Sequence, residues 1–133
     1  GFPISAALVK PEIADVIHAG DHGSTFGGNP FVAHVAKEAF TYLSSDAFLT
    51  HVTAVAHYFD EQLQALASTY PFITRIKGLG LMKGLEVDSP VLDLVQDAFK
   101  NKLLVARAGS NVLRFLPPLI IEKEQVDEAI SIL

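Results

Sequence analysis

The sequence contains no cysteine, which excludes disulfide bonds and zinc sites built from thiolates. Basic residues are few as well: ten lysines and arginines stand against fifteen acidic residues, for a formal net charge of −5. Nucleic acids and anionic membrane surfaces select basic patches, so we expect neither as a partner. No apolar run approaches the length of a membrane span. These absences favour a cytoplasmic protein whose partner is a small molecule.

The chain has 133 residues, half of them hydrophobic, which is enough for one ordinary core and too little for two full domains. Residue 1 is glycine rather than methionine, and the sequence opens inside a motif that is described below. We therefore expect the chain to be a fragment of a longer protein.

Glycine and hydroxyl residues are concentrated between Gly20 and Pro30, a stretch that holds four glycines, Ser24 and Thr25. Glycine lets the backbone adopt positive φ and approach a ligand closely, so the stretch is typical of an anion-binding loop. Asn29 followed by Pro30 predicts a helix start directly after the loop, and a helix N-terminus carries partial positive charge. The same composition also fits a flexible connection that binds nothing.

The apolar spacing predicts a mixed α/β fold. A buried strand over residues 1–9 and a helical turn over 12–17 come first, and long amphipathic helices follow over 29–43 and 46–70. Beyond Pro71 the pattern changes to short strands and helices, which together predict a small α/β sandwich. We expect strands at 72–77, 81–87, 103–106 and 112–116, with helices beginning near 89 and near 126.

The five histidines do not suggest a metal site. His18 and His22 have helical spacing, but the residues between them lead into the glycine loop, so the two rings do not share a helix face. Asp21 and His22 either shape the loop or bind their own backbone. We interpret the other three as surface or interface residues: His34, His51 and His57.

Arg114 is the second candidate binding residue. It lies in the apolar segment 112–116 and would share a strand face with Val112 and Leu116. A guanidinium among apolar neighbours must be hydrated or paired with an anion. Two interpretations follow: a solvated arginine on an edge strand, or an arginine that holds a substrate carboxylate through two parallel hydrogen bonds.

Three segments carry a resemblance to a known family: Gly-Ser-Thr-Phe-Gly-Gly-Asn-Pro at 23–30 with Gly-Phe-Pro-Ile at 1–4, residues 75–82, and Asn-Val-Leu-Arg-Phe at 111–115. With them the chain resembles the class III (ornithine-type) aminotransferases, which use pyridoxal phosphate, and most of all their acetylornithine-type members. The resemblance implies the C-terminal part of a fold type I transferase. Its parts would be the end of the cofactor-binding large domain with the phosphate loop at 1–29, connecting helices at 30–70, and a small α/β domain at 71–133.

The resemblance also implies site residues. Thr25 would hold the cofactor phosphate of the neighbouring subunit, and Ser24 would lie at that subunit's substrate site. Arg114 would receive the substrate α-carboxylate. The protein would then be a homodimer whose active site lies at the subunit interface. Phe26 stands where the family motif carries tyrosine, so one hydroxyl is absent from that wall.

The implied reaction moves an amino group from N-acetylornithine to 2-oxoglutarate, a step of arginine biosynthesis. The family's Schiff-base lysine would precede Gly1, so we assign no catalytic residue to this chain and expect the fragment alone to be inactive. Ornithine, succinylornithine and 4-aminobutyrate remain alternative donors. From another class, a non-enzymatic anion-binding or dimerisation module also fits the composition.

Overall fold

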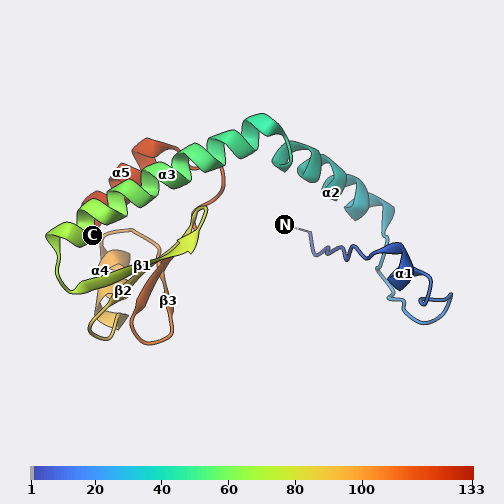
Figure 1. Ribbon diagram of the computed structural model, residues 1–133, viewed down its shortest axis with the longest axis horizontal. Helices are drawn as coiled ribbons and strands as arrows, with labels where there is room; N and C mark the ends of the chain where they lie inside the picture. The colour runs from blue at the N-terminus through green and yellow to red at the C-terminus, as the bar shows by residue number, and fades with distance from the viewer. Residues whose placement is uncertain (1) are drawn as a thin grey trace. The chain divides into compact units, whose positions relative to one another are not determined.

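The computed structural model describes residues 2–133, which divide into two compact units (Figure 1). The first unit ends at Ser45 and the second spans Asp46–Leu133. Within residues 2–133, no helix combines the length and the apolar character that a membrane crossing requires.

Helix α2 (Pro30–Leu43) is the main element of the first unit, and it begins where the sequence predicts. The Asn29 side-chain oxygen accepts hydrogen bonds from the backbone N–H groups of Phe31 and Val32, at 3.0 and 3.2 Å. This cap satisfies two of the four N–H groups that a helix start leaves without partners. None of the described residues up to Ser45 is buried, so the unit has no hydrophobic core of its own.

The predicted strand over residues 1–9 is wrong for the part that the structure describes; Gly1 lies outside that part. Residues 2–10 form neither helix nor strand, and every one of them is exposed. A strand requires neighbours for its backbone hydrogen bonds, and the sheet found among residues 2–133 consists of strands from the second unit alone. The helical turn that follows is shorter than expected and covers α1 (Pro11–Ala14).

The second unit combines three helices with a four-stranded antiparallel sheet, whose strand order is β1-β2-β4-β3. Its elements are α3 (Asp46–Thr69), β1 (Ile73–Leu79), β2 (Met82–Val87), α4 (Leu92–Lys100), β3 (Ala106–Ala108), β4 (Val112–Phe115) and α5 (Lys123–Ile132). Both long helices and three of the four predicted strands are confirmed with small changes at their ends. The α/β sandwich is confirmed too.

The third strand begins later than predicted, because residues 102–103 complete the end of α4. Lys102 has a positive φ of 67°, and its N–H donates to the Phe99 carbonyl at 3.0 Å. The Leu103 N–H donates to the Ala98 carbonyl at 2.9 Å. This pair of hydrogen bonds is a Schellman helix end, which uses N–H groups that a strand would need. The strand therefore starts only at Ala106.

One face of the sheet carries the core. Alternation along β2 and β4 turns Leu85, Val87, Leu113 and Phe115 toward the helices, where the Phe59 and Phe115 rings meet edge-on at 5.6 Å. Side chains from α3 and α5 complete this cluster, among them Val55, Leu63 and Val126. The residues between them on β2 and β4 point to the opposite face, which no helix of this core covers.

Lys83 is a charged side chain within this core. It lies on the same face of β2 as Leu85 and is only 4% exposed. Its Nζ atom is 2.6 Å from an Asp60 carboxylate oxygen on α3, and Asp60 is 35% exposed. The ion pair thus links the long helix to the sheet and compensates a buried charge.

Candidate functional site

The glycine loop is a compact turn in the first unit. Gly20 and Gly28 have φ values of +99° and +69°, in the left-handed region that favours glycine. Gly27 approaches Ser24 closely: its N–H donates to the Ser24 carbonyl at 3.3 Å, and a Cβ atom at 27 would lie 2.6 Å from Ser24 Oγ. A larger residue at position 27 would therefore fill the space that the Ser24 hydroxyl occupies.

The loop borders a hollow of about 730 Å³ within the first unit. Ser24 and His22 line this hollow from the loop, and Pro3 to Ser5 line it from the N-terminal segment. Thr25, next to Ser24 in the chain, is exposed. The structure thus places both predicted hydroxyl residues at an accessible turn that is followed by the N-terminus of α2.

Asp21 and His51 have local structural roles. The Asp21 carboxylate accepts a hydrogen bond from the His18 backbone N–H at 2.7 Å, so Asp21 binds its own backbone. His51 Nε2 lies 3.1 Å from the Ile121 carbonyl oxygen and joins α3 to the segment before α5. Among residues 2–133, no three histidine or acidic side chains gather in a way that could hold a metal ion.

Arg114 lies in an interior strand, not at an edge, because β4 pairs with β2 on one side and β3 on the other. Its partners in register are Gly84 on β2 and Ala106 on β3, the two smallest residue types. The Arg114 Nε atom is buried, and no acceptor within residues 2–133 binds it. The edge-strand interpretation is therefore excluded, and the guanidinium retains hydrogen-bonding capacity.

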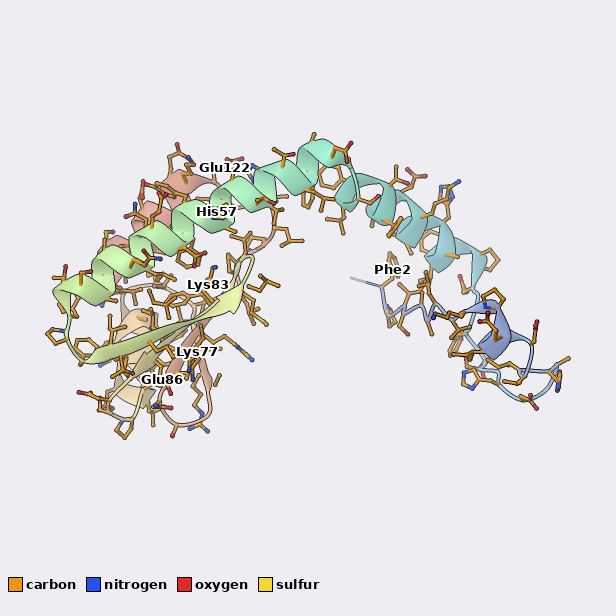
Figure 2. All side chains as sticks on the ribbon, viewed as in Figure 1. Phe2, His57, Lys77, Lys83, Glu86 and Glu122 are labelled. Carbon is orange, nitrogen blue, oxygen red and sulfur yellow. The ribbon has the colours of Figure 1, made fainter. Side chains whose placement is uncertain are left out.

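The neighbours of Arg114 are less apolar than the sequence suggested. Across the uncovered face of the sheet, Lys77 on β1 pairs in register with Gly84, and Glu86 on β2 pairs with Val112 on β4. Figure 2 labels Lys77 and Glu86 on these adjacent strands, and Lys77 Nζ is 2.8 Å from Glu86 Oε2. The hydrogen bond from Lys77 holds the pKa of Glu86 below its ordinary value, and the positive charges of Lys77 and Arg75 add to this effect.

Sequence analysis missed Lys77, Gly84 and Glu86 because their closeness to Arg114 depends on strand register. The alternation of basic residues at 75 and 77 was a usable signal, since residues two apart in a strand share a face.

The glycine loop belongs to the first unit and Arg114 to the second. Each surface can bind an anionic group: the loop through glycine backbone and hydroxyls, and Arg114 through its guanidinium.

Comparison with known proteins gives consistent matches over the whole chain. The family model described as "Aminotransferase class-III" matches residues 1–133. A curated relative, the mitochondrial acetylornithine aminotransferase of Eremothecium gossypii, is 38% identical over 133 residues, which cover 100% of this chain and 31% of the relative. The chain thus spans about a third of the length of that relative.

Two solved structures of related enzymes have a similar fold over most of this chain. The acetylornithine aminotransferase from Elizabethkingia anophelis matches with a TM-score of 0.85 at 29% identity, covering 94% of this chain and 34% of that one. An ornithine aminotransferase from Toxoplasma gondii, crystallised with partial occupancy of PLP (pyridoxal phosphate) at its active site, matches with a TM-score of 0.78 at 35% identity. That match covers 91% of this chain and 30% of the other.

Proposed function

This chain belongs to the class-III aminotransferases, and from this we propose that the complete protein transfers an amino group from N-acetylornithine to 2-oxoglutarate with pyridoxal phosphate as cofactor. The donor is inferred from the relative named acetylornithine aminotransferase, which matches over the entire chain. The observation that carries the proposal is Arg114, an arginine in an interior strand whose buried Nε has no acceptor among residues 2–133.

The glycine loop is the proposed binding site for the phosphate group of the cofactor. The Ser24 hydroxyl leaves no room for a Cβ atom on residue 27, so glycine is needed there. The N-terminus of α2, which follows the loop, favours negative charge. Thr25 would bind the phosphate, and Ser24, which lines the adjacent hollow, would lie near the substrate. When bound, pyridoxal phosphate supplies an electron sink that stabilises negative charge at the carbon bearing the amino group.

Arg114 would bind and orient the α-carboxylate of 2-oxoglutarate, which is bonded to the carbon whose oxo group reacts. A guanidinium offers two parallel N–H donors that match the two oxygens of a carboxylate. Gly84 and Ala106 on either side leave the space beside the arginine free of larger side chains. The 2-oxoglutarate molecule would thus be held by its α-carboxylate, with the adjacent oxo group left to react.

We propose further that the protein is a homodimer in which the glycine loop serves the partner's cofactor. The uncovered apolar side chains of the first unit, such as Phe26, Phe31 and Phe40, support an extensive interface.

A cytoplasmic location is proposed from composition and charge. The E. gossypii relative is named as mitochondrial, so fractionation of source cells is the direct measurement.

Substituting Arg114 by lysine in the complete protein tests the carboxylate role. A lysine ammonium is a point charge and cannot form two parallel hydrogen bonds, so Arg114→Lys should lower kcat/KM for 2-oxoglutarate about tenfold or more. Pyridoxal phosphate affinity, measured by absorbance titration, should stay unchanged. Normal kcat/KM for 2-oxoglutarate would contradict the role.

Arg107→Lys is the matched control, because Arg107 is exposed on β3 beside Ala106 and has no proposed contact with substrate. It should leave kcat/KM within about twofold of the unmodified protein.

Measuring both variants with N-acetylornithine and with ornithine also separates the proposed donor from the ornithine alternative. A preference for ornithine would change the donor and leave the carboxylate role intact.

A further inference from the structure

We propose that Lys77 is a positioning residue, which holds the Glu86 carboxylate away from Arg114 and so keeps the Arg114 guanidinium free for a substrate carboxylate. This inference rests on the proposed function of Arg114. It concerns a pair of residues on the uncovered face of the sheet, neither of which needs to touch substrate.

Strand register brings Glu86 within reach of Arg114. Arg114 pairs with Gly84, and Glu86 is two residues further along the same strand, so it is the diagonal neighbour of Arg114 on the same face. Diagonal neighbours in an antiparallel pair lie about 7–8 Å apart, a distance that long side chains span. Without another partner, Glu86 would therefore form an ion pair with Arg114 inside the protein.

Lys77 opposes this pairing by binding Glu86, together with a hydrogen bond from the Asn111 side chain and the charge of Arg75, the register partner of Glu86 on β1. Lys77 Nζ lies 2.8 Å from Glu86 Oε2, whereas the buried Nε of Arg114 has no acceptor within residues 2–133. The hydrogen bond and charge of Lys77 also keep the pKa of Glu86 below its ordinary value, so the carboxylate stays ionised and stays with the ammonium at neutral pH.

Gly84 makes the arrangement depend on Lys77. It pairs with Lys77 on β1 and with Arg114 on β4, so it occupies the position between the two cations. A Cβ at position 84 would lie 2.9 Å from Val112 Cγ1, which explains the glycine. Glycine adds no side chain of its own here, so the Val112 methyl group is the nearest neighbour beside the path from Glu86 to Arg114. Competition between Arg114 and the two cations of β1, Lys77 and Arg75, decides where the carboxylate lies.

The first experiment removes the competing cation in the complete protein. Glutarate, a dicarboxylate with no amino or oxo group, serves as a probe that binds without reacting. Lys77→Met should raise the dissociation constant of glutarate, measured by calorimetry, roughly fivefold, which is the upper range for an exposed ion pair. KM for 2-oxoglutarate should rise by a similar factor while kcat at saturation is retained. Unchanged glutarate affinity would overturn the inference.

The second experiment restores binding by removing the carboxylate as well. Lys77→Met with Glu86→Gln should return the glutarate dissociation constant to within about twofold of the original. Failure of this double variant to recover would contradict the inference. Lys77→Arg, which keeps a cation at position 77, should retain the original affinity.

A field control separates competition from loss of charge. Arg107→Met removes one positive charge next to Ala106, a direct partner of Arg114, without contacting Glu86. It should change glutarate affinity less than Lys77→Met does. Equal weakening by the two variants would mean that Lys77 acts only through the general electrostatic field.

A crystal structure of Lys77→Met should show the Glu86 carboxylate within hydrogen-bond distance of the Arg114 guanidinium. A Glu86 side chain turned to solvent would oppose the inference.

Arg114→Met distinguishes failure of this inference from failure of the proposed function. If glutarate binds Arg114→Met as tightly as the original protein, the carboxylate role itself is wrong, and this inference is overturned with it. If Arg114→Met abolishes glutarate binding and Lys77→Met does not weaken it, the proposed function stands and only the role of Lys77 is overturned. Lys77 is 41% exposed, so its replacement should leave the thermal unfolding midpoint close to that of the original protein.

Discussion

Arg114 illustrates how a charge is accommodated in an interior strand. Residues on both neighbouring strands are small where they face it, Gly84 and Ala106, so the long side chain lies over the sheet without displacing others. Its Nε atom nevertheless lacks an acceptor in the part of the chain that the structure describes, which costs free energy unless a ligand supplies one. A residue kept under such a cost is a candidate for binding, and the same reasoning motivates the proposed carboxylate role.

Candidate binding residues can be picked out from the sequence only in part. Ser24, Thr25 and Arg114 stand out because glycine-rich hydroxyl loops and arginines in apolar strands are unusual in their local context. Lys77 has only the weak signal of alternating basic residues at 75 and 77, and Glu86 has none, because a charge in a short strand is ordinary. Their importance arises from pairing between strands far apart in sequence, and one residue of register changes every neighbour.

Thr25→Ala in the complete protein should weaken pyridoxal phosphate retention while the fold is preserved. A hydroxyl that donates to a phosphate makes a charge-assisted hydrogen bond, worth about 1.5–3 kcal/mol. Absorbance titration of the cofactor should therefore show a dissociation constant raised roughly tenfold or more.

Thr41→Ala is the matched control for this measurement, since the Thr41 hydroxyl donates to the Lys37 carbonyl within α2 at 2.9 Å. It removes the same group from the same unit and should leave cofactor affinity unchanged. Equal affinity of Thr25→Ala and the original protein would remove Thr25 from the phosphate site.

Helices were more predictable than strands at the scale of elements. The start of α2 follows from its Asn-Pro cap, and α3 follows from apolar residues at every third or fourth position, because these signals are local. The strand expected at residues 1–9 failed because strand formation depends on partners. The late start of β3 reflects a Schellman helix end at Lys102, a residue type that rarely adopts positive φ.

The buried ion pair between α3 and β2 gives a prediction for stability. Asp60→Asn should destabilise the second unit by roughly 1–3 kcal/mol, because it leaves the Lys83 ammonium buried without a counter-charge. Lys83→Met should cost much less, since an apolar side chain of similar length suits the core face and exposed Asp60 can be hydrated. Urea unfolding monitored by circular dichroism measures both. A larger loss for Lys83→Met than for Asp60→Asn would show that the pair is net stabilising.

The two units differ in how they are stabilised when the whole molecule is considered. The second has a continuous core from α3, the sheet and α5, whereas none of the described residues up to Ser45 is buried. Burial of apolar surface is the dominant favourable term in folding. The first unit must therefore gain most of its stability from surfaces that cover its apolar side chains.

The isolated 133-residue chain should associate in solution as a consequence. Exposed apolar side chains in the first unit include Phe2, Leu8, Val16, Phe26, Phe31 and Phe40, and patches of this kind promote association. Multi-angle light scattering at micromolar concentration should show species above the monomer mass. The segment Asp46–Leu133 serves as the control and should associate less. A monodisperse monomer of the 133-residue chain with a single cooperative melt would contradict the expectation.

The turn of residues 109–111 between β3 and β4 carries a constraint on how this protein can evolve. The turn is fixed at both ends: the Ser110 carbonyl accepts from the Val91 N–H at 3.0 Å, and the Asn111 carbonyl accepts from the Val87 N–H at 2.9 Å. Leu113 and Arg114 follow on opposite faces, so inserting or deleting one residue here would exchange a core side chain for a charged one. Mutation can therefore vary the side chains of this turn, but a change in its length would move Arg114 to the other face of the sheet and damage the core in a single step.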